Sequence, residues 1–134
     1  MKLRSIVYLA LVAVLAAVSL SYAAPKEYPE ISQADLQAAI QAGKVTLIDC
    51  NGTHSYKEHH IPGAINFAAD QGHLAQLLPA DKNALIVSYC ANPKCPMFKD
   101  GADAAQALGY HNIRHFAPGI QGWIQAGGKT QSAN

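Results

Sequence analysis

The sequence has few cysteines and almost no net charge. Three cysteines occur in 134 residues, and ten basic side chains stand against nine acidic ones. A small disulfide scaffold would carry more cysteines, in an even number, so we expect these cysteines to serve chemistry rather than structure. A nearly neutral chain also lacks the basic surface that binds nucleic acid or an anionic membrane. We therefore expect no nucleic acid among its partners.

Several other features are missing. The chain has no internal repeat, no low-complexity segment, no phosphate-binding loop and no motif of a hydrolase triad. Its six histidines do not fall at the spacing of a compact metal motif. What remains is one compact domain, for which we expect no cofactor.

The first 23 residues differ from the rest of the chain. Lys2 and Arg4 precede an apolar run at residues 6–20, and small residues stand at both ends of the tripeptide at 21–23. This is the layout of a secretory signal peptide, and the run is shorter than the ~20 residues of a membrane-spanning helix. We predict a signal peptide at 1–23, a single domain at 24–134 and export to the periplasm or beyond the cell. No membrane association is expected after cleavage, and a retained anchor is the alternative.

Short apolar runs alternate with segments of helical spacing along the remaining chain. This alternation is typical of an α/β domain with a mostly parallel sheet, in which ligands bind beyond the carboxyl ends of the strands. Ser32 is expected to cap the first helix and Gly43 to end it. The expected strands are 45–48, 64–67, 84–89 and 111–116, and the expected helices are 34–41, 55–60, 73–78, 96–108 and 120–125.

Cys90 is the strongest candidate for chemistry. It closes the apolar run 84–89, turn-forming residues follow it, and Pro96 suits the first position of the next helix. A thiol placed between a buried strand and a helix N-terminus meets converging amides, which favour a thiolate or a persulfide. We therefore predict that Cys90 is a nucleophile; the alternative is a buried thiol that only packs.

These residues resemble the single-domain rhodaneses over nearly all of the region 24–134. The matching motifs are Leu47-Ile48-Asp49, the HHIPGAIN run at 59–66, Val87-Ser88-Tyr89-Cys90 and the PGIQGW run at 118–123. The resemblance implies a five-stranded, mostly parallel sheet with helices on both faces. It also implies that Cys90 accepts a sulfane sulfur from a small donor, thiosulfate or a persulfide, and passes it to a thiol acceptor. The resemblance leaves open whether a partner protein takes part.

The loop after Cys90 departs from the family pattern. Members that use thiosulfate commonly have a glycine in this loop and an arginine five residues after the cysteine, where this chain has Asn92 and Cys95. Asparagine tolerates the positive φ of glycine, and each proline removes an amide donor. The loop amides are expected to surround the sulfur, with Lys94 as a nearby cation. The predicted sulfur-binding residues are Ala91, Asn92, Pro93, Lys94 and Pro96.

Cys95 and two residues that follow the expected strand 45–48 leave alternatives open. Cys95 is incidental, resolves a Cys90 persulfide by forming a disulfide, or belongs to a redox couple with Cys90; a bridge needs Cα atoms within ~7 Å. Asp49 is expected to orient loop or backbone groups. Cys50 packs on the sheet, pairs with Cys90, or joins Cys90, Cys95 and His54 around zinc or cuprous copper. The rival functions are therefore a thiol–disulfide redox protein and a non-catalytic module that binds sulfur or metal.

Overall fold

The computed structural model describes residues 27–134, so the predicted signal peptide and its cleavage site lie outside the described residues. Within the described part, no helix is long and apolar enough to cross a membrane. The sheet has the order β2-β1-β3-β4, and all neighbouring strands are parallel. Its strands are β1 (Thr46–Asp49), β2 (Ile65–Asn66), β3 (Ile86–Tyr89) and β4 (Ile113–His115).

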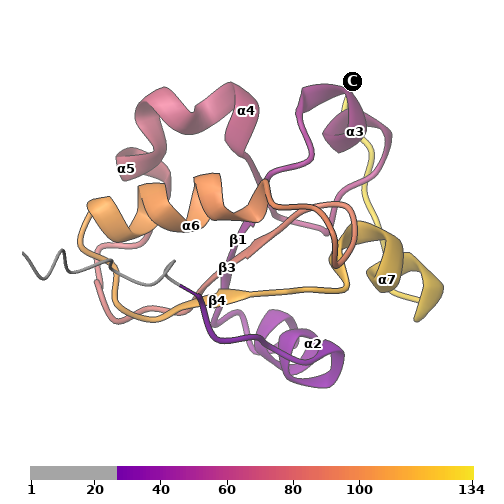
Figure 1. Cartoon of the computed structure of the whole chain (residues 1–134), viewed down its shortest axis with the longest axis horizontal. Coiled ribbons are helices and arrows are strands. Elements are labelled where there is room, and N and C mark those ends of the chain that lie inside the picture. Colours follow the sequence, from indigo (N-terminus) through magenta and orange to yellow (C-terminus); the bar gives the residue numbers. More distant parts are fainter. Residues whose placement is uncertain (1–26) are drawn as a thin grey trace, which may run out of the picture.

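Helices cover both faces of this sheet, as Figure 1 shows. One face carries α2 (Gln33–Gln41) and α7 (Gly119–Gln125), and the other carries α4 (Phe67–Asp70), the 3-10 turn η1 (Gln71–His73), α5 (Leu74–Leu77) and α6 (Phe98–Ala107). The short helix α3 (Thr53–Glu58) follows β1. The predicted α/β architecture is therefore confirmed.

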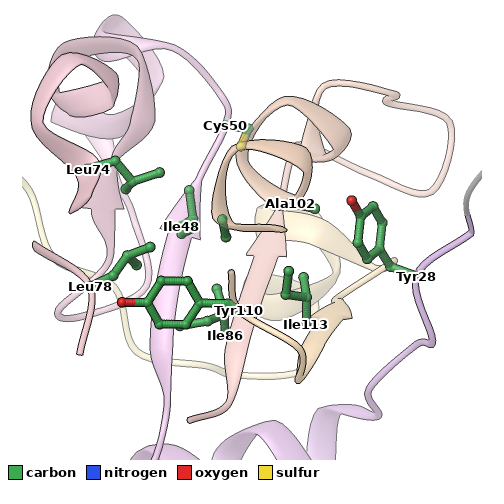
Figure 2. Close-up of a cluster of buried hydrophobic side chains, with 10 residues drawn as sticks. Tyr28, Ile48, Cys50, Leu74, Leu78, Ile86, Ala102, Tyr110 and Ile113 are labelled. Atoms are coloured by element: carbon green, nitrogen blue, oxygen red, sulfur yellow. The ribbon is translucent and has the colours of Figure 1, made fainter. Parts of the chain in front are cut away.

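The two faces bury separate apolar clusters. Beneath α6 lie Ile48, Ile86 and Ile113 from the strands, with Tyr110 and Leu74 beside them (Figure 2). The opposite cluster includes Leu36 of α2, Leu47 and Val87 of the sheet, and Ile120 and Trp123 of α7. Neighbouring residues of one strand, such as Leu47 and Ile48, enter opposite clusters because side chains alternate across a sheet.

The resemblance implied five strands, whereas the sheet within residues 27–134 has four. The fifth position, at the outer edge of β4, is occupied by a short extended segment at residues 29–31. The Ile31 amide donates to the His115 carbonyl at 3.0 Å, and the His115 amide donates to the Pro29 carbonyl at 2.9 Å. The segment forms only one parallel bridge, between Glu30 and His115. Pro29 has no amide to extend the pairing, and Ser32 already caps α2, as predicted.

Two of the differences from the sequence-based boundaries have a clear local cause. The expected strand 64–67 is shorter, because the Asn66 side chain accepts from the Ala69 amide at 3.4 Å and so caps α4 at Phe67. The expected helix 96–108 begins at Phe98 rather than at Pro96. Pro96 and Met97 first form a turn, and the Lys99 amide donates to the Pro96 carbonyl at 3.1 Å. Gly109 ends α6 with a φ of 94°, in agreement with its predicted role.

The buried face of α6 contains Gly101, Ala102 and Ala105. Small residues let the helix lie close to the sheet. A Cβ atom at Gly101 would lie 2.7 Å from both the Cys50 sulfur and a methyl carbon of Ile48. Met97, directly before α6, is 50% exposed.

Adding a methyl group at Gly101 tests how closely α6 packs. We expect Gly101→Ala to lower the free energy of unfolding by about 1–3 kcal/mol, because overpacking forces neighbouring side chains or the helix to shift. Urea unfolding of the reduced protein measures this loss. Gly72→Ala is the matched control, since a Cβ atom at Gly72 would have no neighbour within 4 Å. Equal stability of the two variants would contradict the proposed close packing.

Candidate active site

Cys90 and Cys50 follow neighbouring strands at the same edge of the sheet. The Cys50 amide donates to the Tyr89 carbonyl at 2.9 Å, which continues the pairing of β1 with β3 beyond the last strand residues. Cys90 is 3% exposed and Cys50 is 5% exposed. The edge of the sheet at which the sequence placed the site therefore holds two buried cysteines.

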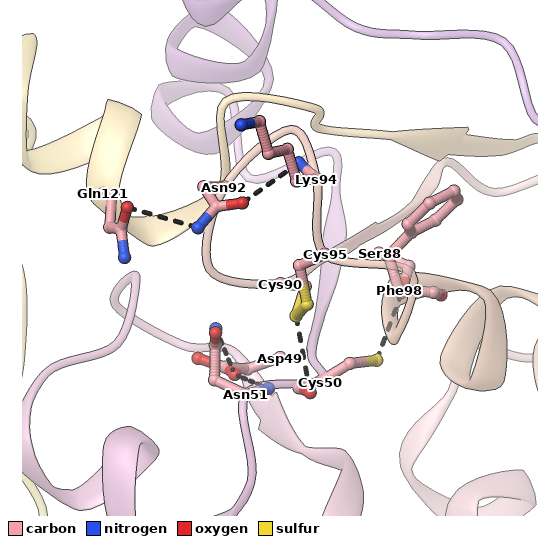
Figure 3. The surroundings of a disulfide bond; sticks show 10 residues. All are labelled: Asp49, Cys50, Asn51, Ser88, Cys90, Asn92, Lys94, Cys95, Phe98 and Gln121. Carbon is pink, nitrogen blue, oxygen red and sulfur yellow. Dashed lines mark hydrogen bonds between the residues drawn. A yellow bond between two sulfur atoms is a disulfide. The ribbon is translucent and has the colours of Figure 1, made fainter.

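The loop after β3 brings Cys95 back onto Cys90. Their Cα atoms are 6.0 Å apart and their sulfur atoms lie within bonding distance, so the pair forms a disulfide in the structure (Figure 3). Cys95 is partly exposed, whereas Cys90 is buried. The two loop cysteines are thus close enough to react with each other.

Asn92 organises the loop between these cysteines. Its side-chain oxygen accepts from the Lys94 amide at 3.0 Å, its carbonyl accepts from the Cys95 amide at 3.1 Å, and its side-chain nitrogen donates to Gln121 at 3.4 Å. Within residues 27–134 only glycines have positive φ, so Asn92 does not adopt the left-handed conformation considered from the sequence. It holds the turn through hydrogen bonds instead.

The first turn of α7 fixes the start of the loop. The Ile120 amide donates to the Cys90 carbonyl at 2.9 Å, and the Gln121 amide donates to the Ala91 carbonyl at 3.0 Å. Gly119 makes this approach possible: it has a φ of 64°, and a Cβ atom there would lie 2.5 Å from the Ala91 carbonyl carbon. Our reading of the sequence missed this contact, although the glycine in the PGIQGW run was the available signal.

The oxidised loop does not direct all of its predicted sulfur-binding groups at Cys90. The amides of Lys94 and Cys95 donate within the loop, and Pro93 and Pro96 have no amide. Figure 3 shows the Lys94 side chain on the far side of the loop from the two sulfur atoms. The sulfur-binding amides and the cationic role of Lys94 therefore stay predictions, which concern the reduced loop.

Asp49 is completely buried and accepts three hydrogen bonds. One carboxylate oxygen accepts from the amide and from the side chain of Asn51, at 2.8 and 2.9 Å. The other accepts from the Tyr89 hydroxyl at 2.7 Å, and that hydroxyl accepts from the Ile61 amide at 3.0 Å. Burial, followed by the charge of Asp49, raises the pKa of Tyr89, so its hydroxyl stays protonated and donates. Asp49 thus connects three segments at the base of the site.

Cys50 faces away from the disulfide. Its sulfur lies 3.4 Å from the Ser88 hydroxyl oxygen, under α6, while the Cys90 sulfur lies 3.9 Å from the Cys50 carbonyl oxygen (Figure 3). Because Ser88 gives its only hydroxyl hydrogen to the Phe98 carbonyl at 2.7 Å, Cys50 is the donor to Ser88. Cys50 therefore packs on the sheet, and the structure does not pair it with Cys90.

The metal site considered from the sequence is not assembled. Among the described residues, no three histidine, cysteine, aspartate or glutamate side chains come together as metal ligands. Cys50 points towards α6, and His54 is highly exposed in α3, beside Glu58. A pocket of about 470 Å³ next to the loop is lined by Cys50, Gly52, Phe67, Ala68, Gln71, Met97, Asp100 and Asp103.

The environment of Cys50 predicts a thiol that reacts poorly in the folded protein. Burial raises its pKa from 9.0 to about 11, which lowers the thiolate population at neutral pH about a hundredfold. In the reduced native protein we expect iodoacetamide to modify the partly exposed Cys95 first. Cys50 should react only after unfolding in guanidinium chloride, which mass spectrometry of digests can follow. If all three cysteines of the native protein were modified at one rate, this prediction would be wrong. The variant Cys50→Ser is the control, because it should lack the slowly reacting thiol.

A parallel α/β domain with a cysteine at the end of a central strand, at the start of a compact loop, defines the class of this protein. Residues 32–126 match the family model of the rhodanese-like domain, and the chain belongs to that family. The resemblance seen in the sequence is therefore confirmed.

Three known proteins illustrate the similarity. An HTH-type transcriptional regulator of Mycobacterium tuberculosis is 35% identical over 98 residues, which cover 72% of this chain and 42% of that protein. This chain thus spans less than half the length of that relative. A rhodanese-related protein of Thermoplasma volcanium superposes with a TM-score of 0.61 at 22% identity, over 79% of this chain and 100% of that one. A human single-domain sulfurtransferase has a TM-score of 0.59 at 21% identity, over 74% and 97%.

Proposed function

We propose that this protein is a sulfurtransferase in which Cys90 carries a sulfane sulfur as a persulfide and delivers it to a thiol acceptor. The main support is the position of Cys90, buried at the carboxyl end of β3 at the start of the loop of a rhodanese-like domain. A structural neighbour is described as a single-domain sulfurtransferase, which agrees with this chemistry.

The proposed reaction has two displacement steps on the reduced protein. The Cys90 thiolate attacks the outer sulfur of thiosulfate or of a persulfide donor, a new sulfur–sulfur bond forms, and sulfite or the donor thiolate leaves with the electron pair. An acceptor thiolate then attacks the outer sulfur of the Cys90 persulfide, and Cys90 leaves as a thiolate. No redox cofactor enters either step.

Cys95 provides a second outcome for the same persulfide. Its thiolate can attack the inner sulfur, which belongs to Cys90, so that hydrosulfide leaves and the Cys90–Cys95 disulfide forms. A Cα separation of 6.0 Å in a hydrogen-bonded loop supports this step. We propose Cys95 as the resolving thiol, acting when no external acceptor is present.

The same disulfide favours one alternative, a thiol–disulfide redox protein that uses Cys90 and Cys95. Export would suit both functions, because disulfides persist in oxidising compartments. We propose that residues 1–23 direct this export and are then removed. The mass of protein recovered from the periplasm should therefore correspond to a chain that begins near Ala24.

Sulfur loading of Cys90 tests the proposed function. The full chain is expressed with its leader, and the exported protein is reduced, freed of reductant and treated with thiosulfate or a low-molecular-weight persulfide. We expect one of two results. The intact mass rises by one sulfur atom where the Cys90 persulfide persists, or it falls by two hydrogens, with release of hydrosulfide, where Cys95 resolves the persulfide. Cys90→Ser should show neither change.

The remaining outcomes favour other functions. A bridge that forms without hydrosulfide release, in a protein that takes up no sulfur once reduced, would favour the redox function. A reduced protein that stays unreactive towards every donor would favour a binding module.

A further inference from the structure

We propose that a thiol partner opens the Cys90–Cys95 disulfide by attacking the sulfur of Cys95, so that Cys90 is the leaving thiolate. This inference rests on the proposed function, because it describes how the sulfur-carrying thiolate of Cys90 is set free. The site of attack on a disulfide depends on access to each sulfur, on local charge and on the leaving thiolate.

Access to the Cys90 sulfur is restricted. Cys90 is 3% exposed, and its sulfur lies 3.9 Å from the Cys50 carbonyl oxygen, which occupies one side of it (Figure 3). That oxygen carries partial negative charge and repels an approaching thiolate. The Ile120 amide holds the Cys90 carbonyl at 2.9 Å, so the residue is tied to α7 and cannot easily turn outward. A nucleophile therefore meets both steric and electrostatic opposition at Cys90.

Cys95 lies at the open side of the same bond. It is partly exposed, and its neighbours on both sides, Lys94 and Pro96, are exposed. Met97, two residues further on, is 50% exposed. The only side-chain charge among these neighbours is the positive charge of Lys94, which does not repel an anionic nucleophile. The partner's thiolate therefore reaches Cys95 first.

The two steps balance. The partner thiolate forms a bond to the Cys95 sulfur, the Cys90–Cys95 bond breaks, and Cys90 leaves with the electron pair. A second thiol, from a dithiol partner or another small thiol, attacks the partner's sulfur in the mixed disulfide and releases the Cys95 thiolate. The disulfide gains two electrons and the two partner thiols lose two. Cys90 stays at the end of β3 throughout, ready to accept a sulfur.

Trapping the mixed disulfide tests this inference. The oxidised protein is treated briefly with reduced glutathione, and the reaction is stopped with acid and N-ethylmaleimide. Trypsin cleaves after Lys94 and thereby places Cys90 and Cys95 on different peptides. We expect glutathione on Cys95 and maleimide on Cys90, about tenfold or more in excess over the reverse pattern, because access decides which sulfur is attacked. A second arm uses a thioredoxin without its resolving cysteine, and an adduct on Cys95 in either arm supports the inference.

The oxidised protein unfolded in guanidinium chloride is the matched control, since access to the two sulfurs no longer differs there. Adducts mainly on Cys90, or the same ratio in native and unfolded protein, would overturn the inference. A purified protein that neither contains nor forms the bridge would also overturn it. Sulfur loading of Cys95→Ser, which cannot form the bridge, tests the proposed function separately from the opening of the disulfide.

Discussion

Replacing Cys95 by serine is expected to lengthen the lifetime of a persulfide on Cys90 by at least about tenfold in the absence of other thiols. A thiol held within the same short loop acts at an effective concentration of millimolar or more. The Cα atoms of Cys90 and Cys95 are 6.0 Å apart, and Asn92 holds the intervening turn, so little reorganisation separates the two sulfurs. Without Cys95, the persulfide must wait for an external acceptor.

The measurement is the decay of the sulfur-loaded mass, together with the hydrosulfide released. The wild-type protein should end as the disulfide with one hydrosulfide per chain, and Cys95→Ser should keep its added sulfur. Cys50→Ser is the matched control: Cys50 contacts Ser88 under α6 and should leave the lifetime unchanged. Equal lifetimes of wild type and Cys95→Ser would rule out the resolving role.

The elements of the fold could be read from the sequence wherever burial and alternation were strong. The continuous apolar run that ends at Tyr89 gave β3, and Ser32 and Gly43 gave the ends of α2. The start of α6 could not be read in this way. Pro96 suits a first helical position, but it begins a tight turn that precedes the helix. Local rules do not distinguish these two positions for a proline.

The residues of the candidate site could be predicted from the sequence, but the directions of their side chains could not. Cys90 and Cys95 were expected in one loop, and the structure places them together. The direction of Cys50 was left open, although it continues the alternation of β1: Ile48 and Cys50 both enter the cluster under α6. The contact of Asn92 with α7 was not predicted, for another reason. The hydrogen bond between Asn92 and Gln121 joins residues that are far apart in the sequence, and no local sequence pattern predicts such a contact.

Removal of the Asp49 carboxylate is expected to cost the most stability. In Asp49→Ala the buried Tyr89 hydroxyl and the partly buried backbone amide of Asn51 lose their acceptor, at about 1–3 kcal/mol for each unsatisfied group. We therefore expect the free energy of unfolding to fall by about 2–5 kcal/mol, measured by urea unfolding of the reduced protein. Asp35→Ala, at an exposed position in α2, is the control and should cost far less.

Tyr89→Phe separates the two halves of this network. It removes one donor to Asp49 and the acceptor of the Ile61 amide, so a loss of about 1–3 kcal/mol is expected. Because the Asp49 and Tyr89 side chains share a hydrogen bond, the double variant Asp49→Ala/Tyr89→Phe should lose less than the sum of the single losses. If Asp49 only supports the fold, folded variants will still load sulfur on Cys90 at nearly the wild-type rate. A variant with unchanged stability and lost sulfur loading would instead give Asp49 a direct part in the chemistry.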